Sequence, residues 1–259
     1  MTTSRLRQLC IVFIAAPLSL FAQANRQRSG QGAPVVRVPF VGCKSDGQTG
    51  PLDAPKSAWK AVRIDASVAA RLAYYGTGSA SGVPAPRGWY CFGTYGSSGS
   101  TLYVTPQPIK RDDVFSSTWR GITGPAVQVA GVEGGTSGRF EVARVIARVF
   151  PAYKAFVEGV IKEGLEPASH FPFGPFPNDK LIYRGDRIVE YQTPPRAEGL
   201  GTMSRLLASD DPIDGVAILQ GQTPDLLLVS VRLPPDMSTL TSHIIQQVER
   251  DRAASGSRK

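Results

Sequence analysis

Residues 88–105 read GWYCFGTYGSSGSTLYVT, two runs rich in aromatic and β-branched residues on either side of the turn-forming residues 96–99. Such runs are typical of strands, and a Gly–Ser cluster between them is typical of a turn, so the stretch predicts a β-hairpin. The first run contains Cys91. A cysteine beside a glycine-rich loop can be a catalytic nucleophile or half of a disulfide, and the rest of the chain decides between the two.

The cysteine content favours the disulfide. Once an N-terminal signal has been removed, Cys43 and Cys91 are the two cysteines left, and two cysteines in an exported protein pair without remainder. A thiol nucleophile needs a base, and the chain has only His170 and His243 to supply one. The sequence WYCFG also differs from the surroundings of the papain-like nucleophile. We therefore predict a Cys43–Cys91 disulfide, which would stabilise the fold by about 4 kcal/mol through loop closure.

Residues 1–24 have the order of a secretory signal peptide. Arg5 and Arg7 precede an apolar run at 9–21, and the segment ends in Ala22-Gln23-Ala24, which matches the A-x-A pattern of a cleavage site. The run is shorter than the roughly 18–20 residues that a membrane span needs, and Pro17 interrupts it. We predict cleavage after Ala24 and a secreted or periplasmic protein that does not span a membrane after processing.

The remainder of the chain has the composition of a globular protein, with 42% apolar residues. We predict a flexible lead-in at 25–33, an α+β region at 34–253 with a subdomain boundary near 110–125, and a disordered tail at 254–259. The formal charge falls from +8 to +6 with loss of the signal. Because the basic residues are scattered among acids, we expect an envelope protein or an anionic polymer as partner rather than specific nucleic acid binding.

Periodicity predicts the elements of the α+β region. Strands are predicted at 35–41, 59–64, 125–132, 213–219 and 226–233, and a further hairpin at 181–192. Helices are predicted at 66–75 after the N-cap Asp65, at 140–161 after the N-cap Ser137 with a kink or restart at Pro151, and at 239–252 after the N-cap Ser238. The predicted fold is therefore a set of antiparallel hairpins packed against a long kinked helix and a C-terminal helix, with one disulfide.

Templates for common catalytic and cofactor sites do not match. The glycine-rich GVEGGTSGR at 131–139 lacks the lysine of a phosphate loop, and the serine-hydrolase elbow G-x-S-x-G is missing. Asp46 and Asp53 do not have the spacing of a calcium loop, and two distant histidines make zinc a poor fit. We predict neither a cofactor nor a metal.

The strongest candidate for a binding site is the loop at 191–202, YQTPPRAEGLGT, because binding residues gather on loops braced by strands. Tyr191, Gln192, Arg196 and Glu198 are the candidate binding residues, with His170 as a neighbour.

Two functions remain open on this sequence. The first is a noncatalytic envelope or extracellular binding module, because every catalytic template fails. The alternative is a secreted carboxylate-dependent hydrolase of glycan or cell-wall polymer, in which Glu190 and Glu198 flank the loop. Arg184-Gly185-Asp186 at the tip of the predicted hairpin also matches the tripeptide of integrin ligands, although a turn alone explains the glycine and the aspartate.

Overall fold

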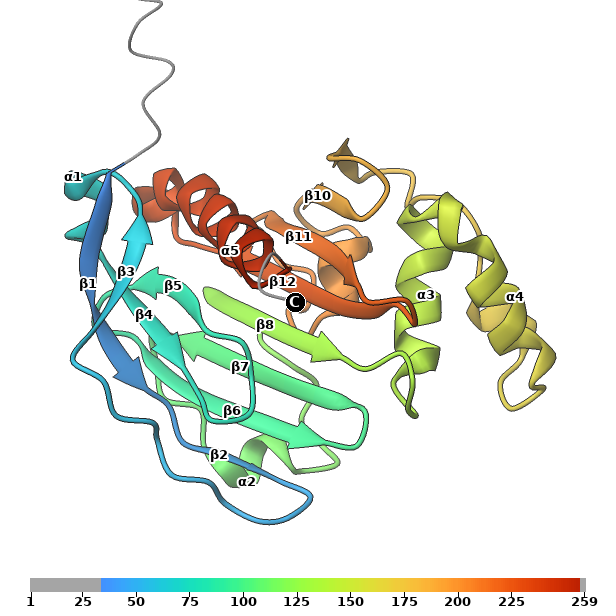
Figure 1. The fold of residues 1–259 in the computed structure, drawn as a ribbon, viewed down its shortest axis with the longest axis horizontal. Coiled ribbons are helices and arrows are strands. Elements are labelled where there is room, and N and C mark those ends of the chain that lie inside the picture. The colour runs from blue at the N-terminus through green and yellow to red at the C-terminus, as the bar shows by residue number, and fades with distance from the viewer. Residues whose placement is uncertain (1–33, 257–259) are drawn as a thin grey trace, which may run out of the picture. The chain divides into compact units, whose positions relative to one another are not determined.

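The computed structural model describes residues 34–256, in which two β-sheets and five α-helices confirm the predicted α+β class (Figure 1). The described residues belong to one compact unit. The predicted signal peptide with its cleavage site and the lead-in at 25–33 lie outside the described residues, as do residues 257–259 of the predicted tail.

The larger sheet has eight strands in the order β2-β6-β7-β8-β12-β11-β10-β9, and all neighbours are antiparallel except β2 and β6. The two predicted hairpins are confirmed as β6–β7 and β9–β10, and the predicted strands at 213–219 and 226–233 pair with each other as β11 and β12. The bounds of the strands are β2 Ser45–Gly47, β6 Tyr90–Gly96, β7 Gly99–Thr105, β8 Ala126–Val132, β9 Lys180–Tyr183, β10 Ile188–Thr193, β11 Ile213–Gln220 and β12 Asp225–Arg232.

The strand β12 lies inside this sheet, as its apolar sequence predicts. Leu227 and Val229 pack into a core shared with the smaller sheet, whereas Leu226 and Leu228 pack into a second core on the opposite face. Because successive residues of a strand point to opposite faces, an almost continuous apolar run is what a strand buried on both faces requires.

The smaller sheet has the order β3-β1-β4-β5, with strands β1 Val35–Gly42, β3 Trp59–Arg63, β4 Leu72–Gly76 and β5 Val83–Pro86. The predicted helix at 66–75 is wrong. The helix α1 covers only Ala66–Ala69, and Leu72–Gly76 forms β4 with every residue buried. Aromatic residues at 74 and 75 favour a strand, and burial between β1 and β5 outweighs the weak helical pattern. Asp65 does occupy the N-cap position, but its side chain makes no cap hydrogen bond.

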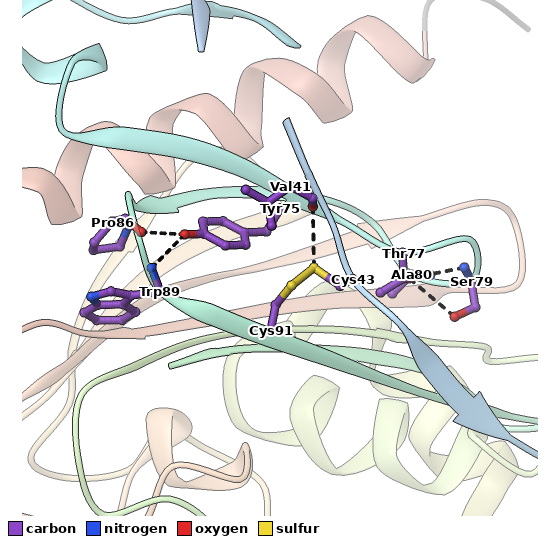
Figure 2. Close-up of a disulfide and its surroundings, with 9 residues drawn as sticks. All are labelled: Val41, Cys43, Tyr75, Thr77, Ser79, Ala80, Pro86, Trp89 and Cys91. Atoms are coloured by element: carbon purple, nitrogen blue, oxygen red, sulfur yellow. Dashed lines mark hydrogen bonds between the residues drawn. A yellow bond between two sulfur atoms is a disulfide. The ribbon is translucent and has the colours of Figure 1, made fainter. Parts of the chain in front are cut away.

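The predicted disulfide joins the two sheets (Figure 2). Cys43 directly follows β1 and Cys91 lies in β6, with their Cα atoms 5.5 Å apart. Beside the bridge, the Tyr75 hydroxyl donates to Pro86 O at 2.7 Å and accepts a hydrogen bond from Trp89 N–H at 3.1 Å. These bonds fix the segment that leads into β6, so the cystine is held from both sheets.

The C-terminal helix α5, Thr241–Gly256, lies in the core that the two sheets share. Its apolar side chains there include Ile244, Ile245 and Val248. The predicted N-cap Ser238 is wrong, because a 3₁₀ helix at Pro235–Leu240 precedes α5 and the Ser238 hydroxyl donates to Pro235 O. At its other end α5 continues through Gly256, so residues 254–256 of the predicted tail are helical.

On the opposite face of the large sheet lies α3, Arg139–Val149, and α4, Lys154–Lys162, packs against α3 (Figure 1). Between them Pro151 begins a 3₁₀ turn at Pro151–Tyr153, which confirms the predicted break. The predicted N-cap Ser137 is wrong: Gly138 is the N-cap, and Thr136 Oγ1 accepts the Gly138 N–H. The remaining short elements are α2 Arg111–Val114 and 3₁₀ turns at Ala168–His170 and Leu200–Met203.

Candidate functional site

The two sheets have four edge strands, and an edge strand presents unpaired N–H and C=O groups that can bind another chain. Native proteins usually block such edges. In the part of the chain that the structure describes, β2 and β5 are blocked, β3 is blocked at its Arg63 end, and β9 is open.

The edges at β3, β5 and β2 are covered in different ways, and β3 is covered at Arg63 only. At β3, Arg63 N–H donates to Gln247 Oε1 of α5 at 2.7 Å, and Arg63 O accepts from Arg250. The sequence of β5 is VPAP, and its two prolines carry no N–H to donate. At β2, Ser45 exchanges two backbone hydrogen bonds with Leu52.

The outer side of β9 has no such cover. Arg184 N–H donates to Ile188 O across the β9–β10 hairpin at 2.8 Å. Because antiparallel pairs alternate, Ile182 and Lys180 also turn their backbone groups toward β10, while Leu181 and Tyr183 turn theirs outward. Within residues 34–256, these outward N–H and C=O groups make no hydrogen bond. The β9 edge can therefore accept another strand.

A cavity of about 520 Å³ lies on the face of β9 that α5 covers, and we call it the α5-side cavity. Its walls include Ile182, Gln192, Asp214 and Ile245. Three hydroxyl-bearing residues also line it: Ser238, Thr241 and Ser242. Gln192 Nε2 donates to Asp214 Oδ1 at 2.8 Å. Burial raises the pKa of Asp214, while Gln192 and Lys180 act in the opposite direction. The cavity is thus polar at its acidic end, and β9 contributes the apolar Ile182 and the basic Lys180 to it.

A second cavity of about 270 Å³ lies on the other face of β9, and we call it the aromatic cavity. It is lined by the end of α3, the 3₁₀ turn at Pro151, residues 173–175 and Tyr183. Arg148 and Lys154 also line it, and the Arg148 guanidinium stacks over the ring of Phe176 at 4.1 Å. Among residues 34–256, no acidic side chain lines this cavity. It combines an apolar floor with a basic rim.

Two of the predicted binding residues, Tyr191 and Gln192, lie on β10 and line the α5-side cavity. Tyr191 is only 4% exposed, and its hydroxyl donates to Val229 O at 2.9 Å and lies 2.7 Å from Ser230 Oγ. Burial raises the pKa of Tyr191 above its usual range. Tyr191 therefore holds β10 to β12, whereas Gln192 is available to a ligand through the cavity.

The other three predicted residues line neither cavity. Arg196 is exposed, has φ of 59° and pairs with Asp210 at 2.6 Å. Glu198 is exposed as well. His170 Nδ1 lies 3.2 Å from Glu166, in the turn before the phenylalanine-rich segment.

The carboxylate Glu190 and the RGD tripeptide meet at the same hairpin. Arg184 Nε donates to Glu190 Oε1 at 2.7 Å, so the arginine of the tripeptide is already paired. Glu190 lines the α5-side cavity, and Glu198 does not. Besides Arg184, Glu190 also interacts with the Glu249 carboxyl on α5. Burial raises the pKa of Glu249, and the negative charge of Glu190 raises it further.

The residues of the site that sequence reasoning missed are Lys180, Ile182 and Tyr183. Ile182 and Tyr183 are 53% and 51% exposed, although they lie in a strand and are apolar. The segment 170–179, with three prolines and three phenylalanines just before this strand, was a signal of the aromatic cavity. The open edge had no signal, because it depends on the order of strands in the sheet.

No helix among residues 34–256 is long and apolar enough to cross a membrane. Comparison with protein-family models, with curated proteins and with solved structures finds no match to this chain. The function therefore has to be inferred from the site.

Proposed function

We propose that this protein is an exported, noncatalytic binding module that binds an extended segment of a partner protein along β9. The observation that carries the proposal is the free edge of β9, where Leu181 and Tyr183 have unbonded outward N–H and C=O groups and a cavity lies on each face. Strand addition uses these two elements: backbone hydrogen bonds supply affinity, and pockets for alternate side chains supply specificity.

Export is supported by two independent features. Residues 1–24 have the pattern of a signal peptide, and Cys43 and Cys91 form a disulfide, which persists in oxidising compartments. An exported binding module meets partners in the envelope or outside the cell, in agreement with the expectation of an envelope partner.

The experiment is selection of random seven-residue peptides on residues 25–259, followed by amide hydrogen exchange with each selected peptide. Strand addition predicts slower exchange at Leu181 and Tyr183, whose amides are unbonded, and little change at Ile182, whose amide already faces β10. Selected peptides that leave the exchange of Leu181 and Tyr183 unchanged would overturn the proposal.

A matched pair of variants isolates the backbone contribution. Tyr183→Pro removes one outward donor without removing a β9–β10 hydrogen bond, because proline is tolerated on an edge strand when its nitrogen faces away from the sheet. Tyr183→Thr removes the ring and keeps the donor. We expect about tenfold weaker binding for Tyr183→Pro than for Tyr183→Thr. Equal affinities would contradict strand addition.

The second candidate, a carboxylate-dependent glycan hydrolase, is favoured by Asp214. Glu190 pairs with Val216 and Gln192 with Asp214, so Glu190 and Asp214 are diagonal neighbours roughly 7–8 Å apart. Both carboxylates line the α5-side cavity, and burial raises the pKa of Asp214, as a general acid requires. In this candidate Asp214 replaces Glu198 as the partner of Glu190.

The hydrolase candidate is tested separately on cell-wall polysaccharide. It predicts turnover by the parent protein that falls by at least about a hundredfold in both Asp214→Asn and Glu190→Gln. Absence of turnover by the parent protein would exclude it. We favour the binding module because Glu190 is already hydrogen-bonded to Arg184, whereas the β9 edge has no internal partner in the described residues.

A further inference from the structure

We infer that the segment added to β9 is acidic and carries an aromatic side chain, with the pattern acidic–aromatic–x–apolar–acidic. This inference rests on the proposed function and names the partner from the side chains that an added strand would meet. It follows from the register of β9, the charges along the edge and the size of the aromatic cavity.

The register fixes which side chain meets which. Antiparallel addition is the slightly more stable arrangement, and it places partner residues opposite Tyr183 and Leu181 in hydrogen-bonded pairs. Residues that are directly opposite share a face of the sheet. Partner residues opposite Tyr183 and Leu181 therefore lie on the face of the aromatic cavity, and those opposite Arg184, Ile182 and Lys180 lie on the face of α5.

The charges along the edge are basic at both ends of β9. Lys180 is its first residue and Arg184 directly follows its last. The acids of this face stand further in, since Glu190 is on β10 and Asp214 on β11, and Glu190 already binds Arg184. Directly opposite pairs of unlike charge stabilise a sheet, so the partner residues facing Lys180 and Arg184 should be Asp or Glu.

The aromatic cavity sets the residue between them. At about 270 Å³ it is smaller than a typical ligand pocket and is suited to a single large side chain. Its floor is apolar, and Tyr183, beside which the partner residue would lie, is half exposed. Arg148 and Lys154 add positive charge at the rim. An aromatic side chain would pack on the apolar floor, and acidic residues of the same segment would be attracted to the basic rim.

A second copy of this chain is a poor occupant of the same edge. Self-pairing that uses all the outward groups places Leu181 opposite Tyr183 of the other copy, and therefore Lys180 opposite Arg184. Like charges directly opposite each other destabilise the pair, and this happens twice in a symmetric dimer. The edge thus favours an acidic partner over itself.

The probe is the blocked peptide SEFTVES, whose phenylalanine would face Tyr183 and whose two glutamates would face Arg184 and Lys180. We expect it to bind residues 25–259 and to slow amide exchange at Leu181 and Tyr183. We expect the charge-reversed peptide SKFTVKS to bind about tenfold more weakly, and likewise the peptide SEATVES, in which alanine replaces the phenylalanine. Binding of SKFTVKS as tight as that of SEFTVES would overturn the acidic assignment, and equal binding of SEATVES would overturn the aromatic one.

A charge swap tests the register directly. The protein variant Lys180→Glu should weaken SEFTVES and restore binding to SEFTVKS, in which only the residue opposite position 180 is changed. The matched variant Lys162→Glu, at the end of α4, should bind both peptides as the parent does. If Lys180→Glu shows no preference between the two peptides, the register is wrong.

Failure of this inference is distinguishable from failure of the proposed function. If selected peptides of another composition protect Leu181 and Tyr183 while SEFTVES does not bind, strand addition stands and the partner class is wrong. If no peptide protects these two amides, the proposed function itself is wrong. Self-association of the parent protein that Lys180→Glu strengthens would identify a second copy as the occupant and would also overturn the inference.

Discussion

Tyr191 crosses over Gly215. The two residues are directly paired in β10 and β11, and the Tyr191 side chain passes over Gly215 to place its hydroxyl on Val229 O and Ser230 Oγ of β12. A Cβ atom added to Gly215 would overlap with the Tyr191 ring and with Val229 O. One tyrosine thus links three strands beside the candidate site, and only glycine leaves room for it.

Gly215→Ala should destabilise the protein by about 3 kcal/mol, because the methyl group meets backbone on one side and a buried ring on the other. Urea unfolding followed by circular dichroism measures the loss. The matched control is Gly159→Ala in α4, where nothing lies near the added methyl group. Alanine in a helix is favoured over glycine, so this variant should gain about 1 kcal/mol. A neutral Gly215→Ala would show that Tyr191 does not hold the position described.

Tyr191→Phe should lower stability by about 1–3 kcal/mol, since it leaves Val229 O and Ser230 Oγ without their buried partner. Binding of peptides at β9 should be unchanged at temperatures where the variant is folded, because the hydroxyl faces β12 and not the edge. Unfolding and peptide titration are measured on the same samples. Loss of binding with unchanged stability would return Tyr191 to the role of a binding residue that its loop position predicts.

The difference between sequence and structure at this site has a physical origin. Two strand-like runs joined by a turn predict the hairpin at 181–192, because a hairpin depends on local sequence. Which strand ends at the edge depends on contacts between distant segments, and the strand order puts β9 at the end of eight strands. For the same reason the sequence does not reveal the structural role of Tyr191. Its hydroxyl bonds to Val229, which is 38 residues away in sequence.

Burial likewise decides where helix and strand patterns compete. The segment at 66–75 has apolar residues on one helical face, yet Leu72–Gly76 is buried on both faces as β4. The broken helix at Pro151 and the apolar strand β12 are predicted correctly because proline and a continuous apolar run each have few alternatives.

Cys43→Ser and Cys91→Ser should lower the free energy of unfolding by similar amounts, about 4 kcal/mol, because each variant removes the same link between the two sheets. The double variant should cost no more than either single one. Denaturant unfolding under nonreducing conditions measures all three. Two free thiols in the mature protein, found by mass spectrometry, would contradict the bridge.

Arg232 should be irreplaceable by lysine. Its side chain is buried, and the guanidinium donates to Ile122 O, Thr123 O and Gly124 O on one segment and to Leu207 O on another. A single ammonium group cannot reach both segments, so some of these partly buried carbonyl oxygens lose the donor that Arg232 supplies. Arg232→Lys should cost about 2–3 kcal/mol and speed amide exchange at 122 and 207. Arg187→Lys, an exposed arginine bonded to Gly221 O, should cost less than about 0.5 kcal/mol and is the control.

Glu141 should make the protein less stable as pH rises. Its carboxyl lines a small polar cavity beside the β6–β7 turn and makes no hydrogen bond within residues 34–256. Burial raises its pKa, against the opposing effect of Arg205 and Arg144. The native state therefore keeps this proton at a pH where the unfolded chain has released it, and stability falls as pH rises from the ordinary value of 4.5 through the native pKa.

Glu141→Gln removes this titration while keeping the shape of the side chain. We expect the variant to be more stable than the parent at about pH 7, and the difference to vanish below the ordinary pKa of glutamate, where both side chains are neutral. Thermal unfolding across this range measures the difference, and Glu158→Gln, at an exposed ion pair with Lys154, is the control for loss of one charge. If Glu141→Gln is instead less stable than the parent at about pH 7 and this difference shrinks as the pH falls, the carboxylate has an attractive partner, and Arg144 and Arg205 outweigh burial.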